Sequence, residues 1–301
     1  MRIAYIVQCH KNPQQINMLL KHLLFEENDV YLHIDRKSIG LRDQIILQEH
    51  LYVLPIEETV AVKWGQISQV DATLKLLQAV MKSGKTYDFV WLISGQDFPL
   101  ATNLKIFDKL ESKKNSAYME VLSIDTKRYK RLLKRNEVWT AQCSVRKGLC
   151  ARLLRNFWYM LTGGRYHTFA LFRRHYQKDT FYFGSSWWCL PYNAIVSMMQ
   201  YLADNPRFYR FYSHCHCPDE SFFQTLYLNH GTVAENLENI LTYIDWEDCK
   251  DSPKTFTLKD LDMLNAMKDK GYLLARKFDM NLDADIIYKL SEQLCREARH
   301  D

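Results

Sequence analysis

A short apolar run that ends at a glycine, an acid and a proline constrains this chain most. The run is Phe89–Ile93, and Gly95, Asp97 and Pro99 follow it closely. Its length fits a buried strand, Gly95 permits a tight turn, and Pro99 prevents further strand pairing. Ligands of open α/β sheets bind just outside the carboxyl ends of strands, so Asp97 is a candidate ligand-handling residue. The alternative is a turn-forming aspartate after a core strand.

Strand-like and helix-like patterns alternate along the 301 residues. This alternation predicts an α/β fold with a mainly parallel central sheet flanked by helices, in one domain that spans residues 1–301. We expect strands at residues 3–7, 30–34, 51–54, 89–93, 117–121 and 180–183. We expect helices at residues 12–25, 41–49, 68–83, 103–114 and 191–203.

A basic, aromatic segment at about residues 126–178 interrupts the alternation and is predicted to be a helical insertion. Fourteen Lys and Arg residues lie between Lys127 and Lys178, against one acid, Glu137. Within it, Arg152–Leu161 has the composition of an amphipathic helix with a cationic rim. Such a segment suits an anionic membrane surface or an acidic, lipid-linked substrate, and the alternative is an ordinary solvated basic face. No nucleic-acid motif accompanies it, so no nucleic-acid partner is expected.

The amino-terminal residues and the cysteines point to a cytoplasmic protein. The chain enters a strand-like run at Ile3 without the pattern of a signal peptide, and no apolar run reaches the length of a transmembrane helix. Among the eight cysteines, the only tight Cys/His cluster is Cys215-His216-Cys217, which lacks the spacing of a zinc site. Reduced, partly buried thiols are the expected state.

Asp35 follows the second expected strand and is a candidate contact for a nucleoside. A carboxylate at this place can accept hydrogen bonds from a ribose or base. The first turn, at residues 8–11, contains no glycine, so neither a P-loop nor a dinucleotide fingerprint is present. This argues against an ATPase, a dehydrogenase and a nucleotidyltransferase that activates sugars.

Two later segments carry candidate sugar-handling and catalytic residues. Trp187 and Trp188 follow a glycine and two serines, and an aromatic ring there can stack on a sugar, although two core aromatics would look the same. Asp219 and Glu220 follow Pro218 where a helix is expected to begin. Acids are favoured at helix starts in any case, but a glutamate in a partly apolar pocket can also serve as a general base.

Together, these segments resemble the core-2/I-branching glycosyltransferase family, which includes β-1,6-N-acetylglucosaminyltransferases and peptide O-xylosyltransferases. The resemblance rests on the order of four motifs, and it extends from Arg2 to Asp279 outside the basic segment. The motifs are Trp64-Gly65 with Ser68, Leu92–Leu100, Gly184–Trp187 and Pro218–Glu220.

The resemblance implies a GT-A-like fold and an inverting transfer from a UDP-sugar without a metal ion or other cofactor. Basic side chains near the carboxyl terminus then neutralise the leaving diphosphate, and the matching residues are Lys277 and, less closely, Lys254. Arg276 is expected to assist them, and the alternative is a surface charge beside the site. Two Asp-x-Asp pairs, at residues 260–262 and 283–285, lie in expected helical segments and are not interpreted as metal sites.

The resemblance also assigns roles to single residues. Glu220 matches the catalytic base, and Asp35 is expected to hold the uridine. The expected contacts of the donor or acceptor sugar are Asp97, Ser185, Trp187, Trp188 and Asp219.

The chain looks like a bacterial-type member that decorates a cell-surface glycan at the inner face of the membrane. We expect N-acetylglucosamine as the donor sugar, with xylose as the alternative, and a glycan acceptor that is lipid-linked. A metal-dependent transferase and a non-catalytic glycan- or membrane-binding protein remain the competing hypotheses.

Overall fold

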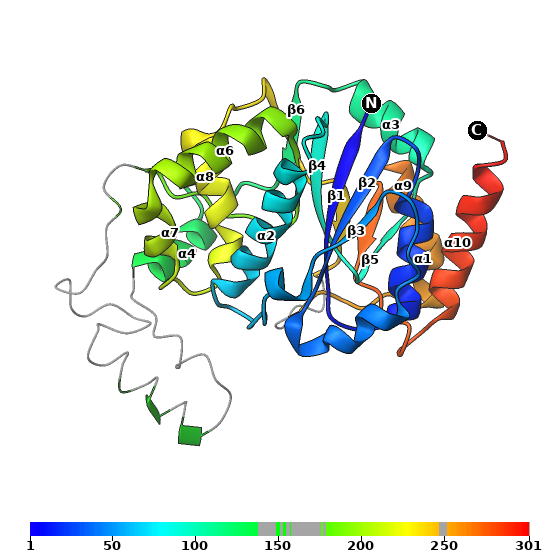
Figure 1. Ribbon diagram of the computed structural model, residues 1–301, viewed down its shortest axis with the longest axis horizontal. Coiled ribbons are helices and arrows are strands. Elements are labelled where there is room, and N and C mark those ends of the chain that lie inside the picture. Colours follow the sequence, from blue (N-terminus) through cyan, green and yellow to red (C-terminus); the bar gives the residue numbers. More distant parts are fainter. Residues whose placement is uncertain are drawn as a thin grey trace.

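The computed structural model describes residues 1–137, 149–150, 153–154, 157, 176, 179–246 and 252–300 (Figure 1). Most of the basic segment therefore lies outside the described residues, including much of the expected helix at 152–161. The described part of the segment begins with helix α4 (Lys127–Glu137).

The central sheet has seven strands in the order β3-β2-β1-β4-β7-β6-β8. Its pairs are parallel except those that β7 makes with β4 and β6, so the expected α/β fold with a mainly parallel sheet is confirmed. The three strands β1, β2 and β4 are buried along their whole length, as their apolar sequences predict. The strands are β1 (Ile3–Cys9), β2 (Asn28–Ile34), β3 (Leu51–Val53), β4 (Phe89–Ser94), β6 (Ser116–Met119), β7 (Trp188–Pro191) and β8 (Asn236–Glu238).

The strand expected at residues 180–183 is wrong, and β7 begins later, at Trp188. The segment before β7 makes hydrogen bonds to α8 (Phe222–His230) instead of a ladder, as in the bond from the Tyr182 N–H to Thr225 Oγ1. The Leu122 N–H, which follows β6, donates a backbone hydrogen bond of 2.8 Å to the Phe183 carbonyl oxygen. The apolar composition of the segment serves packing rather than strand pairing.

A smaller sheet, in the order β5-β10-β9, attaches the carboxyl-terminal part to the end of β4. Its strands are β5 (Asp97–Pro99), β9 (Thr242–Ile244) and β10 (Leu274–Arg276). β5 and β10 are antiparallel, and their register places Arg276 opposite Asp97. Two residues far apart in sequence thus meet just beyond the carboxyl end of β4.

Helices cover both faces of the large sheet, and alternate residues of each strand point to different cores. On one side, Tyr5 and Val7 pack with α1 (Pro13–Leu23), α3 (Asn103–Glu111), α9 (Leu261–Asp269) and α10 (Asp285–Glu297). On the other side, Ala4 and Ile6 pack with α2 (Ser68–Lys82), α4, α6 (Tyr192–Asp204), α7 (Pro206–Tyr212) and α8. Figure 1 shows α1 and α10 on one side of the sheet and α2, α6 and α8 on the other.

Four 3-10 helices complete the described elements: η1 (Arg36–Gln44), η2 (Ile56–Glu58), η5 (Pro218–Glu220) and η6 (Leu258–Asp260). The helix expected at residues 41–49 is wrong, because η1 occupies part of this range and ends at Gln44. Its backbone departs from helical angles at Ser38, and Ile45 is extended. Among the described residues, no helix combines the length and apolar character needed to cross a bilayer.

Candidate active site

The carboxyl ends of β1 and β2 place His10 and Asp35 at one edge of the large sheet. Asp35 is the N-cap of η1, and its Oδ1 accepts a hydrogen bond of 2.8 Å from the backbone N–H of Lys37. Burial and the Lys11 charge lower the pKa of His10, and Asp35 and Arg276 also influence it. β1 pairs with both β2 and β4, and Arg276 lies opposite Asp97 beyond the end of β4, so Asp35 and Arg276 lie along the same edge.

Asp97 lies beyond the end of β4 and is fully buried. One carboxylate oxygen accepts a hydrogen bond of 2.8 Å from the backbone N–H of Ser94, and the other accepts one of 2.7 Å from Arg276 Nη1. Burial raises the pKa of Asp97, and the Arg276 charge partly offsets this rise. Both oxygens bind protein groups, so the carboxylate positions Arg276, and a direct contact of Asp97 with a sugar stays a prediction.

Gly95 allows β1 and β4 to end close together. A Cβ on Gly95 would lie 2.7 Å from the Cβ of Cys9, which is closer than side chains pack. The Gly95 N–H also donates a hydrogen bond of 2.9 Å to the Gln8 carbonyl oxygen. The glycine seen in the sequence thus fixes the shape of the sheet edge on which Asp97 and Asp35 lie.

The guanidinium of Arg276 lies over the ring of Trp187, with 4.2 Å between its Cζ and the ring centroid. Trp187 precedes β7 and is 9% exposed, and both it and Trp188, the first residue of β7, belong to the same hydrophobic core cluster. The Trp188 ring is 1% exposed and packs against Phe223 at a centroid distance of 5.3 Å. The expectation that Trp188 contacts a sugar is therefore wrong, while Trp187 lies beside the candidate diphosphate ligand.

Lys277 and Lys254 lie on neighbouring backbone segments. The Phe256 N–H donates a hydrogen bond of 2.9 Å to the Lys277 carbonyl oxygen, which holds the two segments together. Burial, followed by the charges of Arg276 and Lys11, lowers the pKa of Lys277. This grouping of cations destabilises each of them, so an anion bound among them would be stabilised.

The two lysines have different protein partners. Lys277 Nζ donates a hydrogen bond of 2.6 Å to the hydroxyl of Ser252. This partner is neutral, so it does not balance the charge of Lys277. Lys254 Nζ forms an ion pair of 2.7 Å with Asp260. Lys277 is thus the better candidate for a diphosphate ligand.

Glu220 ends η5, and its side chain is 39% exposed. Its Oε2 accepts a hydrogen bond of 2.6 Å from Arg135 Nη1, which comes from α4 in the basic segment. The Glu220 carbonyl oxygen accepts one of 2.9 Å from the Gly184 N–H. A Cβ on Gly184 would lie 1.8 Å from the carbonyl oxygen of Glu120, so only glycine allows this approach.

Hydrogen bonds join the loop that contains Ser185 and Ser186 to Asp219 and to α8. The hydroxyl of Ser186 donates a hydrogen bond of 2.7 Å to Asp219 Oδ2, and Gln224 donates one of 2.6 Å to the Ser185 carbonyl oxygen. Burial, and then the charge of Glu220, raise the pKa of Asp219 to about 6. Ser185 and Asp219 therefore have structural bonds in addition to any contact with a sugar.

Trp64 belongs to a motif that was recognised in the sequence but given no role there. It is 69% exposed, and its ring meets the edge of His216 at a centroid distance of 5.9 Å. The Gly65 carbonyl oxygen accepts a hydrogen bond of 3.0 Å from the Cys217 N–H. Trp64 thus stands on the loop that supports the Pro218–Glu220 segment.

The two Asp-x-Asp pairs have helix-capping bonds. Asp260 accepts hydrogen bonds from the backbone and hydroxyl of Thr257 in a capping box, and Asp283 accepts one of 2.9 Å from the Leu258 N–H. Within the described ranges, no group of three His, Cys, Asp or Glu side chains could hold a metal ion. Metal-independent catalysis stays a prediction.

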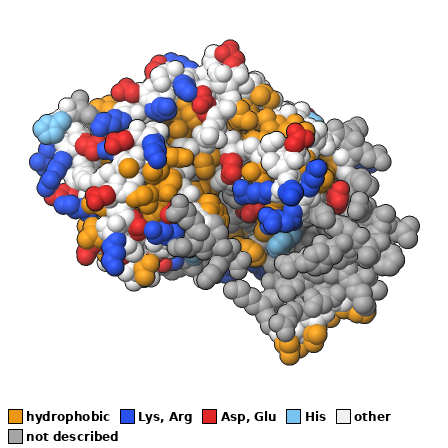
Figure 2. All heavy atoms as spheres, turned by 180° about the vertical axis from the view of Figure 1, so that it is seen from behind, with side chains coloured by type: hydrophobic (Ala, Val, Ile, Leu, Met, Phe, Trp, Pro, Cys, Tyr) orange, Lys and Arg blue, Asp and Glu red, His pale blue; other side chains and the backbone are white. Residues whose placement is uncertain are grey.

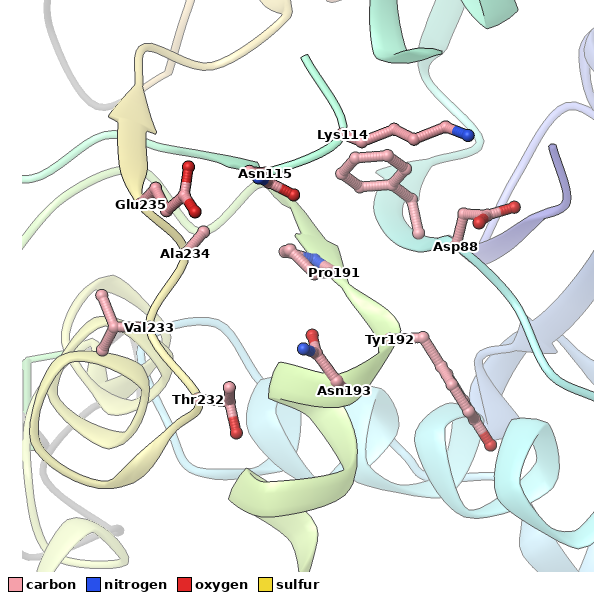
Figure 3. Close-up of a pocket in the computed structure, with 11 residues that line it drawn as sticks. Asp88, Lys114, Asn115, Pro191, Tyr192, Asn193, Thr232, Val233, Ala234 and Glu235 are labelled. Carbon is pink, nitrogen blue, oxygen red and sulfur yellow. The ribbon is translucent and has the colours of Figure 1, made fainter.

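A pocket of about 330 Å³ lies at the opposite end of β4 from these residues (Figure 3). Asp88 and Phe89 line it at the start of β4, together with Lys114, Asn193 and Glu235. None of the residues predicted from the sequence to bind substrate lines it. The candidate active site is instead the edge that carries Asp35, Arg276 and Glu220.

Comparisons with known proteins identify the family of the chain. The chain matches the family model "Branch: Core-2/I-Branching enzyme" over residues 3–267. Similar proteins include xylosyltransferase 2 of Rattus norvegicus, 23% identical over 306 residues, and xylosyltransferase oxt of Drosophila pseudoobscura pseudoobscura, 25% identical over 323 residues. The matches cover 95% and 97% of this chain but 33% of each relative, so the chain spans about a third of their length.

A solved structure titled "WbbM bifunctional glycosytransferase apo structure" is also similar, with a TM-score of 0.40 and 9% identity, over 91% of this chain and 45% of that chain. The family model covers most of the chain and confirms the resemblance seen in its motifs. The protein therefore belongs to the Core-2/I-Branching enzyme family of glycosyltransferases.

Proposed function

We propose that the protein is an inverting, metal-independent glycosyltransferase that moves a sugar from a UDP-sugar to a hydroxyl of a glycan. One observation supports this most strongly. A continuous path leads from the cation Arg276 to Trp187 at 4.2 Å, along the chain to Ser186, and through its 2.7 Å bond to Asp219 beside Glu220. A cationic group and a half-exposed carboxylate thus flank one stretch of the sheet edge.

This arrangement suits a single displacement at the anomeric carbon. Glu220 takes the proton from the acceptor hydroxyl while its oxygen forms the new bond to that carbon. The bond between the sugar and the diphosphate breaks on the opposite side, and UDP leaves with the electron pair. Arg276 and Lys277 stabilise the negative charge that develops on the leaving diphosphate.

The remaining residues hold the substrates. Asp35 lies at the end of β2, where its carboxylate can accept hydrogen bonds from the ribose or uracil. Trp187 is 9% exposed, so it offers a sugar an edge of its ring beside Arg276, and Ser185 and Asp219 lie on the neighbouring loops. Lys254 contributes to the diphosphate site through its position next to Lys277.

We propose N-acetylglucosamine as the donor sugar. The names of the curated relatives make UDP-xylose the alternative, and both are tested in the same assay.

We further propose a lipid-linked glycan acceptor in cell-surface polysaccharide synthesis, at the cytoplasmic face of a membrane. Four large apolar residues of the basic segment, each more than half exposed, support contact with a bilayer. Three of them recur every fourth residue, a spacing that is typical of the apolar face of an interfacial helix. The four residues are Leu149, Leu153, Leu154 and Phe157.

Release of UDP into water tests the proposal without a known acceptor. UDP-N-acetylglucosamine and UDP-xylose are incubated with the unaltered protein, with Glu220→Gln and with Glu26→Gln, a control at an exposed position. We expect Glu220→Gln to slow UDP release by roughly 10²–10⁴-fold, the usual contribution of a general base, while UDP still binds. An unchanged rate would remove Glu220 from this role, and a protein that binds glycans but never UDP would be a non-catalytic binder.

A further inference from the structure

Helix α4 presents a stripe of cations beside the candidate base. Its sequence places basic residues at intervals of three and four, so they share one face of the helix. The opposite face is buried, with Tyr129 and Leu132 only 8% and 6% exposed. The described cations of the stripe are Lys127, Arg128, Lys130, Arg131 and Arg135. Figure 2 shows Lys and Arg side chains gathered beside the grey atoms.

Three of these five cations form no ion pair in the described part of the chain. Arg128 lies 3.9 Å from Glu120, and Arg135 pairs with Glu220. Lys127, Lys130 and Arg131 are exposed and form no ion pair with any described residue. Like charges along one helical face repel one another, so the stripe is destabilising unless an anion lies against it.

Arg135 links this stripe to the chemistry. It occupies Glu220 Oε2 at 2.6 Å, with 35% of the Arg135 side chain exposed. A carboxylate oxygen that accepts a hydrogen bond from a guanidinium is less available for the proton of an acceptor hydroxyl. An anionic group of the acceptor can replace Glu220 as the ion-pair partner of Arg135, and Glu220 is then free to act as the base.

We propose that the acceptor is a polyanionic glycan, a sugar chain with phosphate or carboxylate groups, which lies along α4 and pairs with Arg135 at the active site. This assignment rests on the proposed transferase function and adds the class of acceptor. The stripe favours a charged polymer over a bilayer because the apolar side chains of α4, Tyr129, Leu132 and Leu133, pack against the core.

Binding of a charged oligosaccharide tests the proposal. The probe is a heparin-derived hexasaccharide, with maltohexaose as its neutral counterpart, and UDP binding is measured on each variant. The test variant is Lys127→Glu/Lys130→Glu/Arg131→Glu. The control, Lys21→Glu/Lys259→Glu/Lys270→Glu, changes the net charge equally at exposed positions elsewhere.

We expect the test variant to bind the hexasaccharide at least tenfold more weakly and the control less than twofold more weakly, with UDP affinity unchanged in both. Arg135→Gln should also weaken the binding of the hexasaccharide. Equal losses in test and control variants would overturn the proposal, as would binding only to phosphatidylserine vesicles. Hexasaccharide binding at α4 by a protein that never binds UDP would refute the transferase function itself, and with it the acceptor assignment.

Discussion

Replacing Asp97 by asparagine tests the buried contact that positions Arg276. The substitution keeps the shape of the side chain and an oxygen that accepts hydrogen bonds, but it removes the charge. Asp97 is fully buried, and Arg276, only 15% exposed, lies 2.7 Å away. Arg276 would then remain partly buried without a carboxylate partner.

The expected loss in the free energy of unfolding follows from two opposing effects. Removing one partner of a buried ion pair costs about 3–5 kcal/mol. Part of this is offset, because burial raises the pKa of Asp97 and the neutral amide avoids the cost of burying a charge. We therefore expect Asp97→Asn to lose about 2 kcal/mol, which lowers the urea midpoint by roughly 0.7 M for a slope of about 3 kcal/mol/M.

A double-mutant cycle with Arg276→Met isolates the contact. If the pair is coupled as the geometry indicates, the double variant should recover about 1–2 kcal/mol relative to the sum of the single losses. Glu58→Gln, which breaks the exposed pair with Lys82 at 3.0 Å, serves as a control and should cost less than about 1 kcal/mol. Strict additivity of Asp97→Asn and Arg276→Met would refute the reasoning.

Three further perturbations address other parts of the site. Gly184→Ala places a Cβ 1.8 Å from the Glu120 carbonyl oxygen, so we expect a lower thermal midpoint and loss of UDP release; an unaltered midpoint would contradict this contact. Burial raises the pKa of Asp219 to about 6, above its value in the unfolded chain, so stability is lost as pH rises toward 6. Urea unfolding should therefore find Asp219→Asn more stable than the unaltered protein by about 3 kcal/mol above pH 6 and equal to it near pH 4; a constant difference across this range would be inconsistent with that shift. Lys277→Ala should weaken UDP about tenfold in calorimetry and leave uridine unaffected, since the charge acts on the diphosphate; equal losses for both ligands would argue against that role.

Much of the fold could be predicted from local patterns. Prediction of β1, β2, β4 and α2 needs no long-range information. Each of these strands is a continuous apolar run, as expected for a strand buried on both faces, and α2 has a helical apolar period. The position of β7 could not be predicted in this way. Both the expected strand at 180–183 and the true one at Trp188–Pro191 are apolar, and only contacts with α8 and β4 decide between them.

The site shows the same division. Residues at strand ends, such as Asp35 and Asp97, were recognised because chain direction alone places them at one edge of the sheet. The pairing of Glu220 with Arg135 was not foreseen, because it joins residues 85 positions apart through a segment that seemed peripheral in sequence. Trp187 and Trp188 could be told apart only from the structure, in which Arg276 lies over Trp187 and Trp188 packs against Phe223.

Titration of the protein with UDP, first in EDTA and then in excess manganese, tests the central claim most directly. The cations Arg276 and Lys277 at the sheet edge predict UDP binding with the same affinity in both conditions. Binding that requires manganese would move the diphosphate to a metal site and contradict the proposed mechanism. Absence of binding in both conditions would contradict the transferase function as a whole.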